Sequence, residues 1–542
     1  MTSPPPSTAI LPGRSLGFMV LGASLHDILT RVKAQPSLYP KIHLTFDPKY
    51  PVRIPVVLSL PENGLRLRFD GPDQRLRLIE VTDFGKTWLS YKNIEVVKIG
   101  ELGGGLGVRA GPTGPRFRHV YDRLLGPTYA GEYIPPAEDD VKGVGTYVLS
   151  YPGIAFNFPL QASEWSPDKD FVSLLSSHAT APATSMAIFH GESWPKARGT
   201  LFTQAPVNPR SLELAGKANV VDEVELVKIY GEGRIELIRR SSPPFWINLS
   251  ETTPQDLVTE LGPPDAIYRK NDNRLAIHGR KQSLNGLASS QASMPYADGE
   301  SSENDENMSY TGSEREESEG SEDDKTYLDA NDASPEHFYN YFNHGFDILI
   351  STPTTISAPS PTSPHQPRDV PADWPPSENN LVATKVIFHG NVPGSYPFNR
   401  HRRSRWALEH VPTELYKEPL TSEMPFADCK GRLVEAFKSY CNTDEEERSM
   451  QRGMVLNRGW GDSPGSSCEL LGGFEEATAS PVQARKKGSV GAGGAGGGVS
   501  VTGADAGSAA MDNSFGISEI YGFPGLIFEV LKNDAVSTLT VV

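Results

Sequence analysis

The 542-residue chain has a formal net charge of −16, but twelve acidic residues and one arginine lie between Asp298 and Asp324, so the remainder is nearly balanced and offers no basic footprint for nucleic acid. Its three cysteines include no Cys-x-x-Cys pair, which excludes a cysteine-only zinc ribbon or a disulfide framework and fits a reducing compartment. No secretory leader opens the chain, and no run approaches the roughly 18 apolar residues of a membrane span, so we expect a soluble cytoplasmic protein without a transmembrane segment.

The first predicted unit covers residues 14–100 and follows a Pro/Ser-rich segment, 1–13, that we expect to be disordered. Leu25, Ile28, Leu29 and Val32 have the spacing of one apolar helix face. Four short apolar segments follow and predict an antiparallel β-meander over 42–46, 56–60, 65–69 and 76–81.

The second predicted unit covers residues 114–240 and again pairs a helix, ending in Leu-Gly-Pro, with strands and further alternating segments. The glycine-rich run 100–114 before it resembles a phosphate loop at first sight. It lacks both the GxGxxG spacing and a Gly-Lys-Ser/Thr ending, so a flexible connector is the favoured interpretation.

The third predicted unit covers residues 243–410, and its opening stretch, 243–277, shows the pattern most completely. A short strand leads to a helix that Ser250 or Thr252 can cap, and Gly262 ends it. Two low-complexity segments, 280–334 and 352–380, interrupt this unit. We expect both to be disordered, because their compositions cannot bury enough apolar surface to offset the entropy of ordering.

The fourth predicted unit covers residues 411–542 and is interrupted by a disordered insertion over 442–513. The chain therefore reads as an α+β protein of about four repeated units, each an amphipathic helix followed by an antiparallel β-meander, with long disordered insertions. Chance recurrence is the alternative, since a glycine followed by alternating residues is common at hairpins.

The sequence contains no recognisable catalytic motif. No serine-hydrolase elbow, zinc-protease, Walker or kinase motif is present, so we predict no enzyme activity, no catalytic or metal-binding residue and no cofactor. The aromatic run from His337 to Asp347 alternates strongly and fits a buried strand better than a binding surface. An enzyme with an unrecognised site stays open as an alternative.

One charged cluster, within the segment Asn391–Trp406, predicts a binding role. It consists of Arg400, Arg402, Arg403, Arg405 and Trp406. Arginine forks match phosphate oxygens, and tryptophan suits a membrane interface, so the cluster is a candidate contact for an anionic lipid or a partner. A solvated run of charge, or a contact to the acidic insertion, is the alternative.

Six blocks together resemble, in order, those of the phagosome assembly factor 1 family, and the insertions resemble fungal elaborations of it. The blocks are RSLGFMVLGASLHDIL, GLRLRFDGPDQRLRLIEV, TTPQDLVTELGPPDAIYRKNDNRLAIH, YNYFNHGFDIL, VIFHGNVPGSYPFN and GLIFEVLKNDAVSTLTVV. The resemblance spans nearly the whole chain outside the low-complexity segments.

The resemblance implies a non-enzymatic regulator of autophagy. It would act with a WD-repeat propeller protein at the phagophore assembly site, where the complex recognises phosphoinositides. It also implies an association with Golgi-related trafficking, which leaves a stand-alone phosphoinositide or membrane-trafficking module as a further alternative. The family offers no catalytic residues to carry over, and the arginines from Arg400 onward depart from its pattern.

Overall fold

The computed structural model describes residues 7–97, 113–136, 143–176, 181–203, 222–269, 336–353, 381–411, 418–457, 499–503 and 517–542. Nearly all of these belong to one compact unit, Met1–Tyr268 with Phe338–Val542. The predicted insertion 280–334 and most of the insertions 352–380 and 442–513 lie outside the described residues. Among the described residues, no helix is both long and apolar enough to cross a bilayer.

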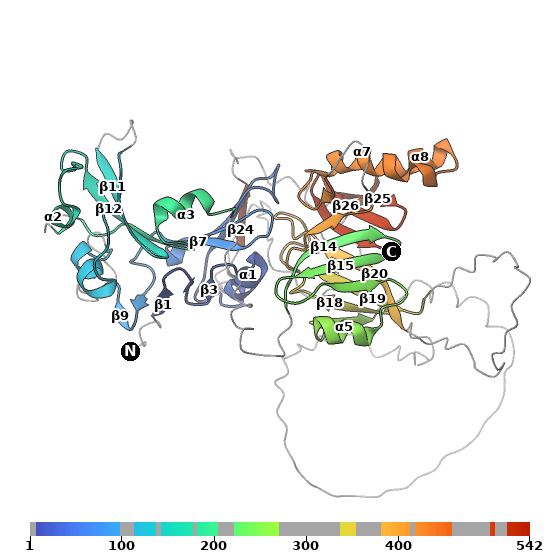
Figure 1. The fold of residues 1–542 in the computed structure, drawn as a ribbon, viewed down its shortest axis with the longest axis horizontal. Helices are drawn as coiled ribbons and strands as arrows, with labels where there is room; N and C mark the ends of the chain where they lie inside the picture. Colours follow the sequence, from blue (N-terminus) through green and yellow to red (C-terminus); the bar gives the residue numbers. More distant parts are fainter. Residues whose placement is uncertain are drawn as a thin grey trace, which may run out of the picture. The chain divides into compact units, whose positions relative to one another are not determined.

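The first half of the unit, up to Thr200, is a series of mostly antiparallel strands with short helices (Figure 1). Its strands are β1 (Thr8–Leu11), β2 (Ser15–Leu16), β3 (Met19–Val20), β4 (Ile42–Phe46), β5 (Val56–Leu60), β6 (Leu65–Phe69), β7 (Leu76–Val81), β8 (Leu89–Tyr91), β9 (Ile94–Glu95), β10 (Glu132–Ile134), β11 (Val144–Tyr151), β12 (Ile154–Gln161) and β13 (Ser185–Phe189). Its helices are α1 (Leu25–Lys33), η1 (Pro61–Asn63), η3 (His119–Leu124), α2 (Phe171–Leu175) and α3 (Trp194–Thr200).

The second half begins at Val224 and has the same alternation of meanders and helices. Its strands are β14 (Val224–Gly231), β15 (Arg234–Arg239), β16 (Phe245–Asn248), β17 (Ala266–Arg269), β18 (His337–Tyr341), β19 (Phe346–Ser351), β20 (Val382–His389), β21 (Trp406–Leu408), β22 (Leu420–Thr421), β23 (Met454–Asn457), β24 (Val499–Gly503), β25 (Ile517–Phe523), β26 (Leu526–Leu531) and β27 (Val536–Val541). Its helices are α5 (Pro254–Leu261), α7 (Phe426–Phe437), η5 (Lys438–Tyr440) and α8 (Asp444–Gln451).

The order of elements in the first half recurs in the second. In each half, a large sheet joins two four-stranded meanders through their last strands, β7 with β13 and β20 with β27. Strand β24, from late in the chain, extends the large sheet of the first half by pairing in parallel with β4. In each half, a smaller sheet pairs the first strand in parallel with the strand after the first meander, β1 with β8 and β14 with β21. A helix precedes each meander. The structure thus confirms the predicted α+β class and joins four helix-and-meander segments in pairs, whereas the predicted unit boundaries stay a prediction.

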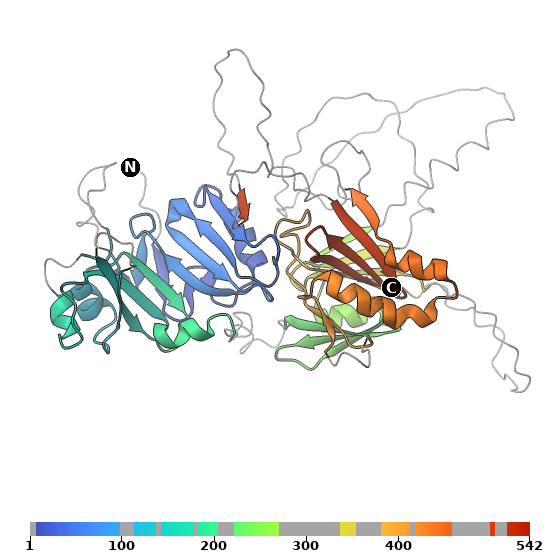
Figure 2. The ribbon, with the colours of Figure 1, turned by 90° about the horizontal axis from the view of Figure 1, so that it is seen from above.

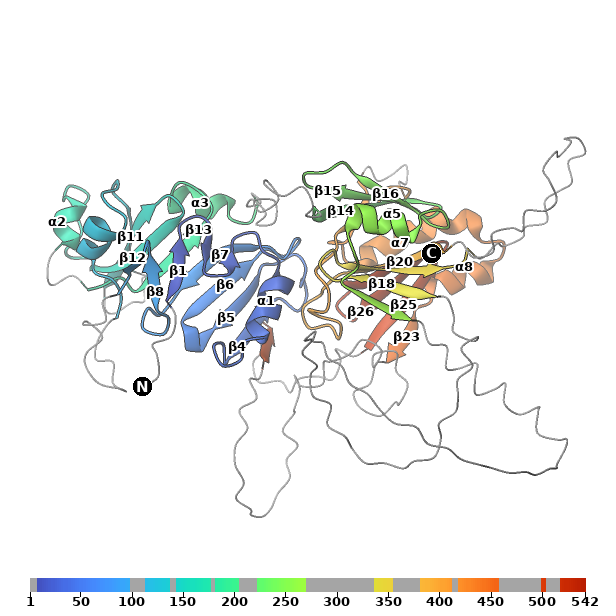
Figure 3. The same ribbon diagram turned by 90° about the horizontal axis from the view of Figure 1, so that it is seen from below.

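Helix α1 shows how the sequence dictates the packing. Ser24 caps it, because the serine Oγ accepts a hydrogen bond from the amide of Asp27 at 3.1 Å. The buried residues Leu25, Ile28, Leu29 and Val32 are those of the predicted stripe. Figure 3 shows α1 against strands β4–β6, and its stripe belongs to the same hydrophobic core as their inward side chains.

The second half has a core of its own, to which both of its sheets contribute. Helix α7 buries Phe426, Cys429, Leu433 and Phe437 in it. Figure 2 shows α7 and α8 beside strands β25 and β26, and the ring of Phe437 lies 6.0 Å from that of Phe523.

The structure differs from the sequence prediction at three places. Residues 8–11, predicted to be disordered, form β1, which pairs in parallel with β8. Residues 444–457 and 499–503, assigned to the last insertion, form α8, β23 and β24, and β24 pairs in parallel with β4. The highly charged α8 gave no apolar signal, but the Thr443 hydroxyl accepts from the amide of Glu446, and its acidic first turn suits a helix N-terminus. The cap of α5 is Thr253, one residue beyond the predicted Thr252.

Candidate functional site

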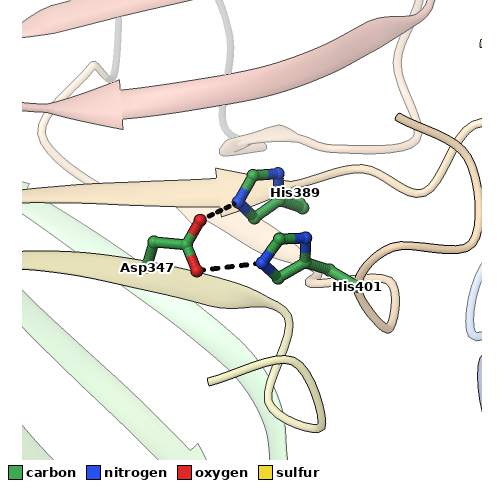
Figure 4. Close-up of side chains that lie close together, drawn as sticks. All are labelled: Asp347, His389 and His401. Carbon is green, nitrogen blue, oxygen red and sulfur yellow. Dashed lines mark hydrogen bonds and ion pairs between the residues drawn. The ribbon is translucent and has the colours of Figure 1, made fainter. Parts of the chain in front are cut away.

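A carboxylate and two imidazoles meet in the second half, where β19 begins and β20 ends (Figure 4). Asp347 is the second residue of β19, His389 is the last residue of β20, and His401 lies in the segment that follows β20. The Nε2 atom of His389 lies 2.8 Å from Oδ2 of Asp347, and Nε2 of His401 lies 2.9 Å from Oδ1. We call these three residues the Asp–His cluster.

Backbone contacts hold the three residues in place. Strands β19 and β20 pair in antiparallel register, with Asp347 opposite Ile387. The amide of Arg402 donates to the carbonyl of Phe342 at 2.8 Å, which ties the 399–405 segment to the turn between β18 and β19. Gly345 makes this approach possible, because its φ is +88° and a Cβ there would collide with the carbonyl oxygen of Arg402.

The cluster is buried and rich in hydrogen bonds. The side chains of Asp347, His389 and His401 are 7%, 14% and 3% exposed. The Asn340 amide donates to Oδ1 of Asp347 at 2.9 Å. The two imidazole rings stack with their centroids 3.7 Å apart. Figure 4 shows both rings facing the one carboxylate.

Burial sets the protonation states. Desolvation, together with the neighbouring His389, lowers the pKa of His401 to about 4, so this ring is neutral at neutral pH. Burial alone would raise the pKa of Asp347, but the two histidines outweigh it and hold that pKa well below its ordinary range. A neutral imidazole and an ionised carboxylate are the forms that bind metal ions.

The five residues predicted from sequence lie next to His401 in the chain, and three of them, Arg402, Arg403 and Trp406, are buried. Arg402 contacts Glu223 at 3.2 Å and the carbonyl of Val224 at 3.3 Å. Arg403 donates to the carbonyls of Pro72, Gly390 and Ser422 at 2.7, 2.6 and 3.1 Å.

The remaining three differ in exposure. Arg405 is one-third exposed and bridges Asp73 at 2.6 Å and Glu423 at 2.8 Å. Trp406 is 2% exposed and belongs to the hydrophobic core. Arg400 is intermediate in exposure, and its guanidinium lies 4.9 Å from the ring centre of Tyr396.

The prediction that these five residues contact a lipid or a partner is not tested by their placement and stays a prediction. The placement does show what each of the five contacts inside the protein. Sequence reasoning missed the Asp–His cluster altogether. One signal was available, because Asp347 interrupts an apolar strand whose six residues are all buried.

Two surface pockets lie elsewhere. One is lined by Asn93, Ile94, Glu95, His119 and Arg123. The other is lined by Phe245, Trp246, Thr252, Asp256, Thr259 and Glu260. Neither includes a member of the Asp–His cluster, so neither provides that cluster with a substrate cleft.

Comparison with known proteins points to one family. The sequence model of phagosome assembly factor 1 matches residues 15–293 and 377–542, which is most of the chain. A PHAF1 protein of Arabidopsis thaliana is 25% identical over 403 residues, 73% of each chain. A PHAF1 protein of Drosophila melanogaster is 22% identical over 411 residues, 73% of this chain and 72% of the fly protein. No solved structure matches.

Proposed function

The chain belongs to the phagosome assembly factor 1 family, and we propose on this basis that it is a non-enzymatic adaptor that acts in autophagy at the phagophore assembly site. The match over most of the chain is the observation that carries the proposal. The partner in this proposal is a WD-repeat β-propeller protein, and the complex of the two recognises phosphoinositides. In this proposal the protein is cytoplasmic and is recruited to the phagophore assembly site, and it also associates with Golgi membranes.

Free strand edges support an adaptor role. Among the described strands, β16 and β23 each end a sheet, so one side of each has unpaired backbone groups. Both present apolar side chains to solvent: Trp246 is 44% exposed, Met454 68% and Val455 64%. A partner can add a strand to such an edge without any catalytic residue in this chain.

Affinity purification of the tagged chain from its own cells, with and without starvation, tests the proposal. Mass spectrometry should recover a WD-repeat protein in stoichiometric amount, and Val455→Lys should reduce that recovery if β23 is the docking edge. The matched control is Tyr129→Lys, because Tyr129 is 93% exposed and lies outside the described strands. Recovery of no propeller protein under either condition would refute the adaptor proposal.

Lipid contact through the predicted cluster is tested separately. Arg400 is the member to change, because Arg402 and Arg403 are buried and their reversal would disturb folding. We expect Arg400→Glu to weaken flotation of the chain with phosphoinositide vesicles, whereas Arg234→Glu, the same charge change at an exposed strand position, should leave it unchanged. Equal flotation of the two variants would remove Arg400 from the lipid contact. Strong flotation without a partner would favour a stand-alone membrane module.

A further inference from the structure

The Asp–His cluster has the composition of a metal site. Two imidazole nitrogens and one carboxylate are ligands that zinc and other late divalent transition metals accept, whereas magnesium and calcium prefer oxygen alone. The ligand atoms of Asp347, His389 and His401 all lie within 4.8 Å of one another. We propose that these three residues bind one divalent transition-metal ion, with zinc as the best match.

The positions of four atoms support this proposal. Each histidine Nε2 faces a different oxygen of the same carboxylate, at 2.8 and 2.9 Å. A zinc ion between them takes both nitrogens and one of the two oxygens, which gives three protein ligands and leaves the fourth tetrahedral position to a water molecule. Zinc bonds of about 2.0–2.2 Å at tetrahedral angles place neighbouring ligand atoms about 3.3–3.6 Å apart, so the nitrogens have to move away from the carboxylate by roughly half an ångström.

The rings have to move further than the carboxylate. Two imidazoles bound through Nε2 to one tetrahedral ion have centroids roughly 5 Å apart, compared with 3.7 Å in the stacked pair. Metal binding therefore separates the stack. His389 is the ring that can tilt, because it ends β20 and its side chain is 14% exposed, whereas that of His401 is 3% exposed.

The surrounding hydrogen bonds favour an additional bound species. Nδ1 of His401 and Oδ1 of Asn340 are buried and have no hydrogen-bond partner among the described residues. Buried polar atoms without partners are uncommon and point to an ordered water near them. Because Nδ1 lies on the other side of the ring from Nε2, this water is a partner behind the metal ligand and not the ion itself. Asn340 already orients Asp347 through its amide, which is the usual role of a residue behind a metal ligand.

A metal ion here joins three separate parts of the second half. It connects β19, the end of β20 and the 399–405 segment, and that segment also carries Arg402, Arg403 and Arg405. The ion is thus suited to a structural role, in which binding energy adds to folding energy. This role is independent of the proposed adaptor function and of its lipid contact.

The test uses the full chain, purified with a tag that contains no histidine. Elemental analysis should find about one zinc per chain. Removal of zinc with a chelator and addition of equimolar Co²⁺ should produce the visible absorption of tetrahedral cobalt, which Zn²⁺ then abolishes. Zinc should also raise the thermal midpoint of the chelator-treated chain.

Variants assign the ligands. His389→Gln should reduce metal content to background, and the control His43→Gln, which changes a histidine on β4, should retain about one ion per chain. His389→Cys keeps a ligand at the site, so its cobalt form should gain a sulfur-to-cobalt charge-transfer band. That band identifies the site even if the glutamine variant does not fold.

Two outcomes would overturn the proposal. One is wild-type protein with background metal and no visible cobalt absorption. The other is cobalt binding in which His389→Cys produces no sulfur-to-cobalt band, because the ion would then lie elsewhere. In either case the three residues form a metal-free hydrogen-bonded cluster.

Discussion

Arg403 provides the sharpest test of whether the arginine run stabilises the fold. Its side chain is 1% exposed and donates to three carbonyls, those of Pro72, Gly390 and Ser422. Burial lowers its pKa to about 10, yet the group stays charged at neutral pH. Arg403→Met keeps much of the volume and removes all three donors.

The expected loss follows from those hydrogen bonds. Each bond to a charged donor contributes about 1.5–3 kcal/mol, but removal of a buried charge also ends its desolvation penalty. We therefore expect a net loss of about 3–5 kcal/mol in the free energy of unfolding. At about 2–4 °C per kcal/mol, the thermal midpoint should fall by roughly 10 °C. Arg403→Lys should lose nearly as much, because one ammonium cannot reproduce the planar fork.

The matched control is Arg400→Met, in the same segment. Arg400 is partly exposed and contacts the face of Tyr396, a contact that contributes about 0.5–1 kcal/mol. The thermal midpoint of Arg400→Met should differ from that of the wild type by at most a few degrees. Scanning fluorimetry and urea titration measure both variants. If Arg403→Met melts with the wild type but loses flotation with anionic vesicles, the structural reasoning is wrong and the predicted lipid contact gains support.

Three further predictions concern other contacts. Burial raises the pKa of Asp73, but Arg405 outweighs burial, and the pKa is lowered overall. This carboxylate therefore stabilises the fold above its unfolded pKa of about 4, and the stabilisation is lost as pH falls through the lower folded pKa. In Arg405→Gln, the free energy of unfolding measured by urea titration should depend less on pH between about pH 4 and pH 2. Gly345→Ala should destabilise by about 1–3 kcal/mol, because the new methyl group collides with the Arg402 carbonyl at positive φ, and a thermal midpoint equal to wild type would contradict this. Thr253→Ala removes the capping hydroxyl of α5 and should cost about 1 kcal/mol by urea titration, whereas an unchanged stability would show that the cap contributes nothing.

Local patterns in the sequence were enough to predict α1 and the first meander. The period of α1 and the alternation of β4–β7 depend on residues a few positions apart, and every predicted meander strand of the first unit is observed. The short strand β1 was missed because prolines and serines on both sides of it favour a loop. One of its partners, β2, is only two residues long, and the other, β8, is about 80 residues away.

The environment of the arginine run could not be predicted in this way. Arg403 and Arg405 contact Pro72 and Asp73, which lie 331 and 332 positions earlier in the chain. Without those partners in view, a run of arginines beside a tryptophan looks like a solvent-facing patch. The Asp–His cluster was hidden for the same reason, since Asp347 lies 42 positions from His389 and 54 from His401.

The repeated order of elements indicates why these polar contacts gather where they do. In the first half, seven residues connect the end of β7 at Val81 to the start of β8 at Leu89. In the second half, the corresponding connection runs from His389 to Trp406 and is about twice as long. The extra length carries His401 and the arginines, so both the Asp–His cluster and the arginine contacts depend on a segment that the first half lacks. The shared order of elements accounts for a hydrophobic core in each half. The longer connection between β20 and β21 accounts for the Asp–His cluster and the arginine contacts, which belong to the second half.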